Sequence, residues 1–491
     1  MKEPSIKKNF IYSMFYQVFT LLMPFITAPY VSRVLGPEGI GIQSYTASYQ
    51  VYFSLLAALG TSEYGAREIS RVRNDRYLRS RIFWEITLLN VLTSAASILA
   101  WGVFIGFAAK YRIYYIVLTI NLLAVMADIS WLFRGLEEFQ TVMVRNAACK
   151  TGGIICIFVF VKSRDNLLCY IVINALTVLA SSLSMWPCLK KYIVKVSRGD
   201  LKIRRHLKET LIYFIPTVAT SVYAVLDKTL IGLMTQDDAQ NGYYQQADKI
   251  IGMAKGITFT AINSVTGVRI SYLFAEKRLD EIHQRIAYTL HYIFFIGTGC
   301  TLGIMGIAPE FVPVFFGPGY SSVVSLLYIL SPVIVIIGIS NCISSHYYTP
   351  SGRRVQSTRF LIAGAGVNLL LNLLLIPDYH SCGAAVASIC AELLITVLYV
   401  RYSNSFVTVR LLFQCGGKNL LAGIVMYGAV RLAAGAEMNA FLRLFWQAGT
   451  GCAVYILVLL LLKEEWIMGI ISEWFYKISG GVEKWKKRNR K

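Results

Sequence analysis

Apolar runs of about 20 residues recur along the whole chain, and they constrain the fold more than any other feature of the sequence. Examples are residues 10–31, 113–133, 167–189 and 441–462. A helix of about 20 apolar residues crosses the roughly 30 Å hydrocarbon core of a bilayer. Only 15% of the 491 residues are charged, against about 25% in an average soluble protein. We therefore predict an all-α polytopic membrane protein with about 14 transmembrane helices.

The placement of the basic residues predicts the topology. The formal net charge is +21, and 38 of the 48 Lys and Arg residues fall in segments that face the cytoplasm if the N-terminus lies inside. Such a concentration on one side follows the positive-inside rule. We expect a multi-pass protein of the cell (cytoplasmic) membrane with both termini in the cytoplasm. Because topology accounts for the basic excess, we expect no nucleic-acid partner.

The longest hydrophilic segment divides the predicted spans into two groups. We predict an N-terminal six-helix lobe at 1–189, a basic cytoplasmic linker at 190–209, a C-terminal six-helix lobe at 210–404, transmembrane helices 13 and 14 at 405–463, and an amphipathic, basic cytoplasmic tail at 464–491. A weak likeness between Arg33-Val-Leu-Gly and Lys228-Thr-Leu-Ile-Gly fits two lobes built as parallel repeats.

Two neighbouring helices, within about Tyr213–Asn263, carry charged residues at positions that should lie in hydrocarbon. These residues are Asp227, Lys228, Asp248, Lys249 and Lys255. One such charge at the centre of a spanning helix costs roughly 2.5–3.5 kcal/mol. With Arg33 added, four basic residues face two acidic ones, which predicts a seat for an anionic group such as a diphosphate. Structural acid–base pairing between the two helices is the alternative interpretation.

Other charged residues allow a functional and a structural interpretation. Glu392 lies in a predicted span, so an ion or proton role is one hypothesis for it. Arg67 and Arg134 flank the predicted inner mouth, where they would attract an anionic head group or serve as ordinary loop charges. Glu85 and Asp128 lie near arginine-rich inner segments, and we interpret them as structural.

Sequence signatures of an enzyme or a metal site are absent from the chain. There is no P-loop, no H-E-x-x-H and no long outer loop with paired carboxylates. Ten cysteines are scattered without a C-x-x-C pair. We expect a protein that binds and moves its ligand, with no catalytic residues, no metal and no resident cofactor.

Eight short segments along nearly the whole chain form a recognisable ordered set. They are Thr27-Ala-Pro-Tyr-Val-Ser-Arg-Val-Leu-Gly-Pro-Glu-Gly-Ile-Gly41, Gly65-Ala-Arg-Glu-Ile69, Trp131-Leu-Phe-Arg-Gly-Leu-Glu137, Asp227-Lys-Thr-Leu-Ile-Gly232, Gly242-Tyr-Tyr-Gln-Gln-Ala-Asp-Lys-Ile250, Asn368-Leu-Leu-Leu-Asn372, Ile376-Pro377 and Gly383-Ala-Ala385. In this order the segments resemble the oligosaccharide (Wzx-like polysaccharide) flippases of the multidrug/oligosaccharidyl-lipid/polysaccharide exporter superfamily.

The resemblance implies a carrier of lipid-linked sugars. Two six-helix lobes would turn an undecaprenyl-diphosphate-linked oligosaccharide from the inner to the outer leaflet by alternating access, for a capsule, exopolysaccharide or O-antigen-like surface polysaccharide. Expected partners are membrane lipids, the lipid-linked substrate, and the polymerase and glycosyltransferases of the same process. A coupling ion, H⁺ or Na⁺, is one hypothesis for the energy source, which the sequence leaves open.

The resemblance implies, by position alone, that Arg33, Lys228, Lys249 and Lys255 bind the diphosphate and sugar. The placement of the other charged residues in the sequence, without the resemblance, suggests coupling or gating roles for Asp227, Asp248 and Glu392. It suggests places at the cytoplasmic entrance for Arg67 and Arg134. Candidates for stacking on sugar rings are Tyr30, Tyr45, Tyr223, Tyr243 and Tyr244. Two alternatives stay open: an exporter of small cations like the multidrug MATE proteins, which would favour carboxylates in the cavity, and a membrane glycosyltransferase or polymerase.

Overall fold

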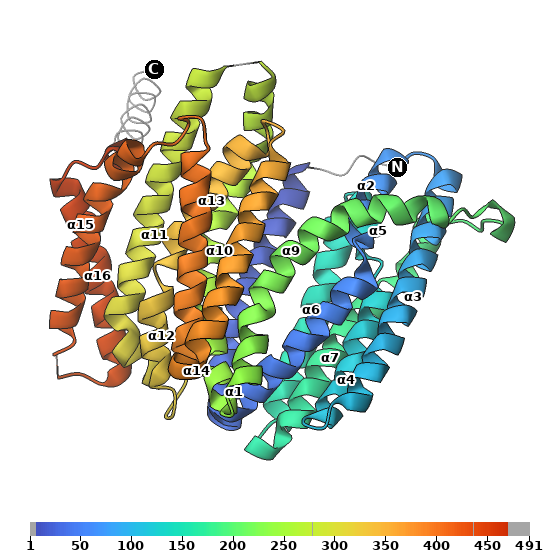
Figure 1. The fold of residues 1–491 in the computed structure, drawn as a ribbon, viewed down its shortest axis with the longest axis horizontal. Coiled ribbons are helices and arrows are strands. Elements are labelled where there is room, and N and C mark those ends of the chain that lie inside the picture. The colour runs from blue at the N-terminus through green and yellow to red at the C-terminus, as the bar shows by residue number, and fades with distance from the viewer. Residues whose placement is uncertain (1–5, 277, 436, 470–491) are drawn as a thin grey trace, which may run out of the picture. The chain divides into compact units, whose positions relative to one another are not determined.

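A computed structural model describes residues 6–276, 278–435 and 437–469, and every regular element within these ranges is a helix (Figure 1). The α-helices are α1 (Ile6–Ala58), α2 (Thr61–Arg71), α3 (Arg76–Phe107), α4 (Arg112–Met126), α5 (Ser130–Gly135), α6 (Phe139–Phe160), α7 (Leu167–Leu183), α8 (Leu189–Tyr192), α9 (Arg204–Met234), α10 (Asp238–Ala275), α11 (Leu279–Phe315), α12 (Ser322–Leu330), α13 (Val333–Ile343), α14 (Arg354–Arg401), α15 (Val409–Ala433) and α16 (Ala440–Leu461). A π-helix at Ser344–Tyr348 follows α13.

The helices confirm an all-α, polytopic membrane protein. Within the described ranges, nine helices are long and apolar enough to cross a membrane. Two of these helices consist of two helical segments each. Non-helical backbone at Gly36 (φ 71°) divides α1, and non-helical backbone at His380 (φ 49°) divides α14. Each kink separates two helical segments of one continuous helix. The count of fourteen spans stays a prediction.

The two helices with the charged residues form in full but are not among these nine. Helix α9 has 31 residues and α10 has 38, so both exceed the length that a bilayer requires. Polar and charged residues interrupt the apolar sequence of both helices. Such helices are stable in a membrane where their polar groups find partners within the protein.

The chain forms two compact packing units. Unit 1 comprises Met1–Gln245, Phe316–Gly319 and Asn372–Ser381; unit 2 comprises Gln246–Phe315, Tyr320–Leu371 and Cys382–Lys491. These units group residues by packing and differ in extent from the predicted lobes at 1–189 and 210–404, whose limits stay predictions.

Unit 1 has two apolar clusters, one toward each end of its helices. One contains the fully buried Phe83, Trp131 and Phe133, and the other contains Trp101 and Leu122. In unit 2, α15 and α16 pack beside α11 (Figure 1). Their contact buries an apolar cluster of Ala422, Met426, Val430, Tyr455 and Leu459. This packing explains how the two last predicted spans join the second group of helices.

The predicted linker 190–209 is bound to α3. Buried Arg79 donates from Nη2 to the carbonyl oxygen of Tyr192 at 2.6 Å. The backbone nitrogen of Val194 donates to Ser80 Oγ at 2.9 Å. The linker is therefore hydrogen-bonded to α3 and is part of unit 1.

The predicted amphipathic tail lies largely outside the described residues, which end at 469. In its described part, the Trp466 ring packs on Phe295 with the ring centroids 4.9 Å apart, and Ile467 is buried. Glu464 lies 3.0 Å from His291 Nδ1. The tail thus begins as a segment docked on α11.

Candidate functional site: the Asp227 cluster and the Glu85 clasp

A buried carboxylate organises the polar interior of unit 1. Asp227 on α9 is 6% exposed. Asn372 Nδ2 donates to Asp227 Oδ1 at 2.7 Å, and the Tyr244 hydroxyl donates to Oδ2. Both donors are neutral, and hydrogen bonds to a buried carboxylate compensate part of its lost hydration. We call Asp227, Asn372 and Tyr244 the Asp227 cluster.

Neutral polar contacts extend from the Asp227 cluster between α9, α10 and the second segment of α1. Ser44 Oγ lies 3.3 Å from Asn241 Oδ1 and 3.2 Å from Gln245 Oε1. Thr229 bonds both Ser48, at 2.8 Å, and the Tyr52 hydroxyl, at 2.8 Å. Because polar side chains of three helix segments satisfy one another here, the interior of this unit tolerates a carboxylate.

Two glycines allow this close packing. A methyl group at Gly41 would lie 1.7 Å from the carbonyl oxygen of Asp238, and one at Gly242 would lie 2.0 Å from that of Pro37. Helix α10 therefore touches α1 backbone to backbone, and only glycine fits at the contact. Both residues belong to the segments that resemble the flippases. The close contact between the helices explains why glycine occurs at these two positions.

The predicted diphosphate-binding residues are divided between the two units. Arg33 is exposed and Lys228 is half-buried in unit 1. Lys249 and Lys255 are half-buried on the part of α10 that belongs to unit 2. Their joint action on one anionic group stays a prediction.

The other predicted coupling residues lie in unit 2. Asp248 on α10 and Glu392 on α14 are both half-buried. Their coupling roles stay predictions. Asp227, the third predicted coupling residue, is a buried and hydrogen-bonded carboxylate, and its coupling role also stays a prediction.

The two predicted entrance arginines lie on helices α2 and α5, which pack together in unit 1. Arg134 donates to Glu63 Oε1 at 2.9 Å and to Ser62 Oγ at 2.6 Å. Arg67 donates to the Tyr213 hydroxyl. Arg67 is exposed and Arg134 half-buried; a role in attracting substrate stays a prediction for both.

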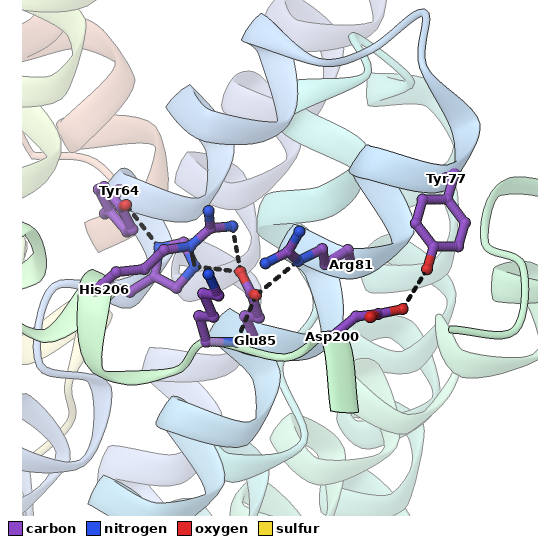
Figure 2. Close-up of polar contacts among 8 residues, drawn as sticks. Tyr64, Tyr77, Arg81, Glu85, Asp200 and His206 are labelled. Atoms are coloured by element: carbon purple, nitrogen blue, oxygen red, sulfur yellow. Dashed lines mark hydrogen bonds and ion pairs between the residues drawn. The ribbon is translucent and has the colours of Figure 1, made fainter. Parts of the chain in front are cut away.

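A second buried carboxylate joins the linker to α3 (Figure 2). Glu85 is completely buried and accepts hydrogen bonds from Arg81 Nε at 3.1 Å, the Lys202 backbone nitrogen at 2.7 Å, His206 Nε2 at 2.8 Å, and Arg205 Nη2. We call these five residues the Glu85 clasp. Figure 2 also shows Tyr77 donating to Asp200 Oδ2 at 2.6 Å, which holds a further part of the linker.

The protonation of His206 follows from its surroundings. Burial lowers the pKa of the His206 imidazole; the hydrogen bond to Glu85 opposes this shift, and the positive charge of Arg205 adds to it. The neutral ring donates from Nε2 to the Glu85 carboxylate. Its Nδ1, 2.7 Å from the Tyr64 hydroxyl, then accepts a hydrogen bond. Because its pKa is lowered, the His206 imidazole of the clasp is neutral at pH 7.

The family follows from a comparison over more than half of the chain. A family model described as "polysaccharide biosynthesis protein" matches residues 6–266. The chain belongs to this family. The matched stretch includes all the predicted site residues except Glu392. It also includes the whole Glu85 clasp.

Curated relatives of similar length support this membership. A putative O-antigen transporter of Escherichia coli (strain K12) is 22% identical over 403 residues, which cover 81% of this chain and 96% of the relative. A putative O-antigen transporter of Shigella dysenteriae is 24% identical over 400 residues, with 81% and 99% covered. A probable low-salt glycan biosynthesis flippase of Haloferax volcanii is 23% identical over 286 residues, with 56% and 58% covered.

Two solved structures show the fold. The lipid II flippase MurJ, in an inward closed conformation, matches with a TM-score of 0.67 at 15% identity, covering 94% of this chain and 99% of that chain. An inward-facing multidrug resistance MATE family transporter of the MOP superfamily matches with a TM-score of 0.58 at 14% identity, covering 86% and 96%. This family member therefore has the fold of polytopic membrane transporters.

Sequence reasoning missed the neutral partners of the buried carboxylates. Asn372 appeared only as part of Asn368-Leu-Leu-Leu-Asn372, and Tyr244 only as a candidate for sugar stacking. Asn368 and Asn372 are both completely buried. Two asparagines four residues apart lie on one helix face, and amides inside a span need partners. That pattern was a usable signal for Asn372.

Proposed function

We propose that this protein is a flippase, which moves a lipid-linked oligosaccharide from the inner to the outer leaflet for the assembly of a surface polysaccharide. The observation that carries the proposal is the full-length relationship to putative O-antigen transporters, of which 96% and 99% are covered. Family membership and a fold like that of a lipid II flippase support it. The expected carrier lipid is undecaprenyl diphosphate.

The proposed flippase lies in the cell membrane with both termini in the cytoplasm. The placement of 38 of the 48 Lys and Arg residues supports this orientation. In the proposed cycle Arg33, Lys228, Lys249 and Lys255 bind the diphosphate and adjacent sugar, because basic side chains form strong charge-assisted hydrogen bonds with phosphate oxygens. Polymerases and glycosyltransferases of the same process are the proposed protein partners.

The proposed cycle is driven by H⁺ or Na⁺, and Asp227 is the proposed coupling group. Its burial and its hydrogen bond from Asn372 support this role. A carboxylate that is 6% exposed is costly in its charged form, so protonation or cation binding would change the stability of its surroundings. If the ion binds one conformation of the protein more tightly than the other, ion binding shifts the equilibrium between the two conformations. Asp248 and Glu392 are proposed to assist in coupling or gating.

Reconstitution tests the proposed flippase directly. The purified full chain is placed in liposomes that contain a fluorescent, short-chain lipid diphosphate oligosaccharide, and a membrane-impermeant glycosidase reports which leaflet holds the sugar. We expect an increase in the cleaved fraction over protein-free liposomes that depends on an imposed H⁺ or Na⁺ gradient. Equal cleavage with and without the protein, combined with transport of small organic cations, would favour the exporter alternative instead.

A further inference from the structure

A pocket lined by aromatic rings opens at one end of unit 1. Its volume is about 230 Å³, and its lining includes Tyr45 and Tyr49 of α1, Phe104 of α3, and Tyr111 and Tyr115 beside and within α4. Gly232 of α9 completes the wall. The turn between α3 and α4 forms the rim, and the predicted topology places this turn outside. We call this cavity the tyrosine pocket.

The rings that line the tyrosine pocket are held in fixed orientations. Tyr49 stacks on Phe104 with the centroids 5.1 Å apart and 28° between the ring planes. It meets Tyr45 edge-on at 5.2 Å and 87°. Aromatic pairs in such geometries are worth about 0.5–1.5 kcal/mol beyond their buried area. The rings are therefore in place before any ligand arrives.

Glycine 232 gives the Tyr45 ring its position. A methyl group at Gly232 would lie 2.0 Å from Tyr45 Cδ2. Any larger residue at this point of α9 would push the ring away, so the absence of a side chain shapes the pocket wall. Gly232 is the last residue of the Asp227-Lys-Thr-Leu-Ile-Gly232 segment. Its contact with the Tyr45 ring explains why this position is glycine.

Polar groups surround the mouth of the pocket. Lys110 Nζ lies 3.3 Å from Asp238 Oδ2 and 4.5 Å from the centroid of the Tyr111 ring. The Tyr111 hydroxyl donates to Asp238. The Lys110 side chain is 65% exposed, so the rim is in contact with solvent. At the pocket wall, the Tyr45 and Tyr49 hydroxyls lie 3.3 Å apart.

This combination of surfaces fits a sugar ring. The faces of aromatic rings are electron-rich and attract the C–H groups on the apolar face of a pyranose through weak hydrogen bonds. Tyrosine hydroxyls both donate and accept, as sugar hydroxyls require. A diphosphate would need several cations, whereas the one lysine of this pocket lies beside Asp238. A hydrocarbon chain would gain nothing from the hydroxyl and carboxylate groups.

The size of the pocket limits the ligand to one ring. Sites for drug-sized ligands have volumes of about 300–1,000 Å³, and the tyrosine pocket has about 230 Å³. We propose that the tyrosine pocket binds a single sugar residue of the transported oligosaccharide at the outer end of unit 1. This proposal rests on the proposed flippase function and adds a glycan subsite to it, separate from the basic residues assigned to the diphosphate.

Binding of free sugars to the purified full chain tests the proposal. The probes are glucose, galactose, mannose, rhamnose, N-acetylglucosamine and N-acetylgalactosamine, with sorbitol as an acyclic control, measured by saturation-transfer NMR in detergent micelles. We expect saturable binding of at least one ring sugar, with a Kd on the order of 1 mM, and no saturable binding of sorbitol. No saturable binding by any of the six ring sugars would overturn the proposal.

Variants assign the binding to the tyrosine pocket. Tyr49→Ala removes a ring face and should weaken binding at least about tenfold, the equivalent of 1.4 kcal/mol. Tyr49→Phe keeps the ring and should retain most of the affinity. Ala109→Trp should block the exposed rim without removing a buried contact, which keeps the test valid if Tyr49→Ala fails to fold. Tyr114→Ala, beside the pocket but outside its lining, is the matched control.

The outcomes separate the subsite from the flippase function. If Ala109→Trp and folded Tyr49→Ala bind sugars like the wild type, the subsite proposal is wrong whatever the transport result. If the wild type flips the lipid-linked oligosaccharide but binds no sugar in this pocket, the flippase function is supported and the subsite proposal is wrong. If the pocket binds sugars while reconstituted protein moves no lipid-linked sugar, the failure belongs to the proposed function.

Discussion

His206 Nε2 lies 2.8 Å from Glu85 Oε2, and this hydrogen bond joins two residues that are 121 positions apart in the sequence. It attaches the start of α9 to α3 through the Glu85 clasp. The linker between the predicted lobes is therefore fixed to the first group of helices.

Glu85→Gln should destabilise the protein. The change removes the only negative charge of the clasp and leaves the guanidinium groups of Arg81 and Arg205 beside a neutral amide. Breaking a buried ion pair from one side costs about 3–5 kcal/mol, and we expect a value near the lower limit because Arg205 is 42% exposed. A thermal melt of the solubilised protein measures the effect. Glu68→Gln is the control, since its surface pair with Arg71 is worth at most about 1 kcal/mol.

The clasp should loosen in mild acid. Because burial lowers the pKa of His206 in the folded protein, the stability that the neutral ring contributes is fully present above the unfolded pKa of about 6.5. It is lost as the pH falls from there through the lower folded pKa. Hydrogen exchange of residues 194–206, corrected for the intrinsic effect of pH, should accelerate below about pH 6.5. His206→Gln should remove this pH dependence; an unchanged profile in that variant would contradict the assignment.

Cross-linking the linker to α3 should leave transport intact. Val194 N lies 2.9 Å from Ser80 Oγ, so Ser80→Cys and Val194→Cys place two thiols within reach of a short bis-methanethiosulfonate, which joins them through reducible disulfides. The ten native cysteines are replaced first. We expect the cross-linked protein to support surface polymer or flipping at near the uncross-linked rate, because both positions belong to unit 1. Loss of transport that a reducing agent reverses would show that the linker moves relative to α3.

Much of the fold was predictable from the sequence because membrane constraints are strong. The apolar runs predicted an all-α polytopic protein, and every regular element of the described residues is a helix. Helices α9 and α10 could also be placed, although their charges lower their hydropathy. The cost of a charge in hydrocarbon also singled out Asp227 from the sequence; the structure shows this residue buried and hydrogen-bonded, and its coupling role stays a prediction.

The partners themselves could not be predicted from sequence separation. Asn372 is 145 residues from Asp227, and the sequence pattern of one helix does not say which other helix it faces. The linker shows the same limit. Its basic composition indicated a solvated cytoplasmic segment, whereas Arg205 and His206 form hydrogen bonds with buried Glu85. The periodicity of a helix does not reveal a contact between residues so far apart in the sequence.

Asp227→Asn should uncouple or abolish ion-driven transport. The amide keeps the shape of the side chain but cannot be ionised, so a carboxylate that binds H⁺ or Na⁺ during the cycle would lose that ability. Hydrogen bonds to charged groups contribute about 1.5–3 kcal/mol, and Asn372→Ala should accordingly shift the ion concentration for half-maximal flipping by about 10- to 150-fold. Flipping rates at varied pH and Na⁺ measure both effects. Ion dependence equal to the wild type in Asp227→Asn would remove its coupling role.

Lys228→Ala and Lys255→Ala should each abolish surface polymer while the protein is still made and inserted. Both lysines are half-buried on helices with a membrane-crossing length, and a charge-assisted contact with phosphate contributes about 1.5–3 kcal/mol to binding. Complementation of a strain that lacks its own flippase gives the readout, with membrane immunoblots for expression. Lys162→Ala, on an exposed turn, is the matched control. Wild-type polymer in both test variants would remove these lysines from the diphosphate seat, and recovery by Lys228→Arg or Lys255→Arg would show that the charge is what matters.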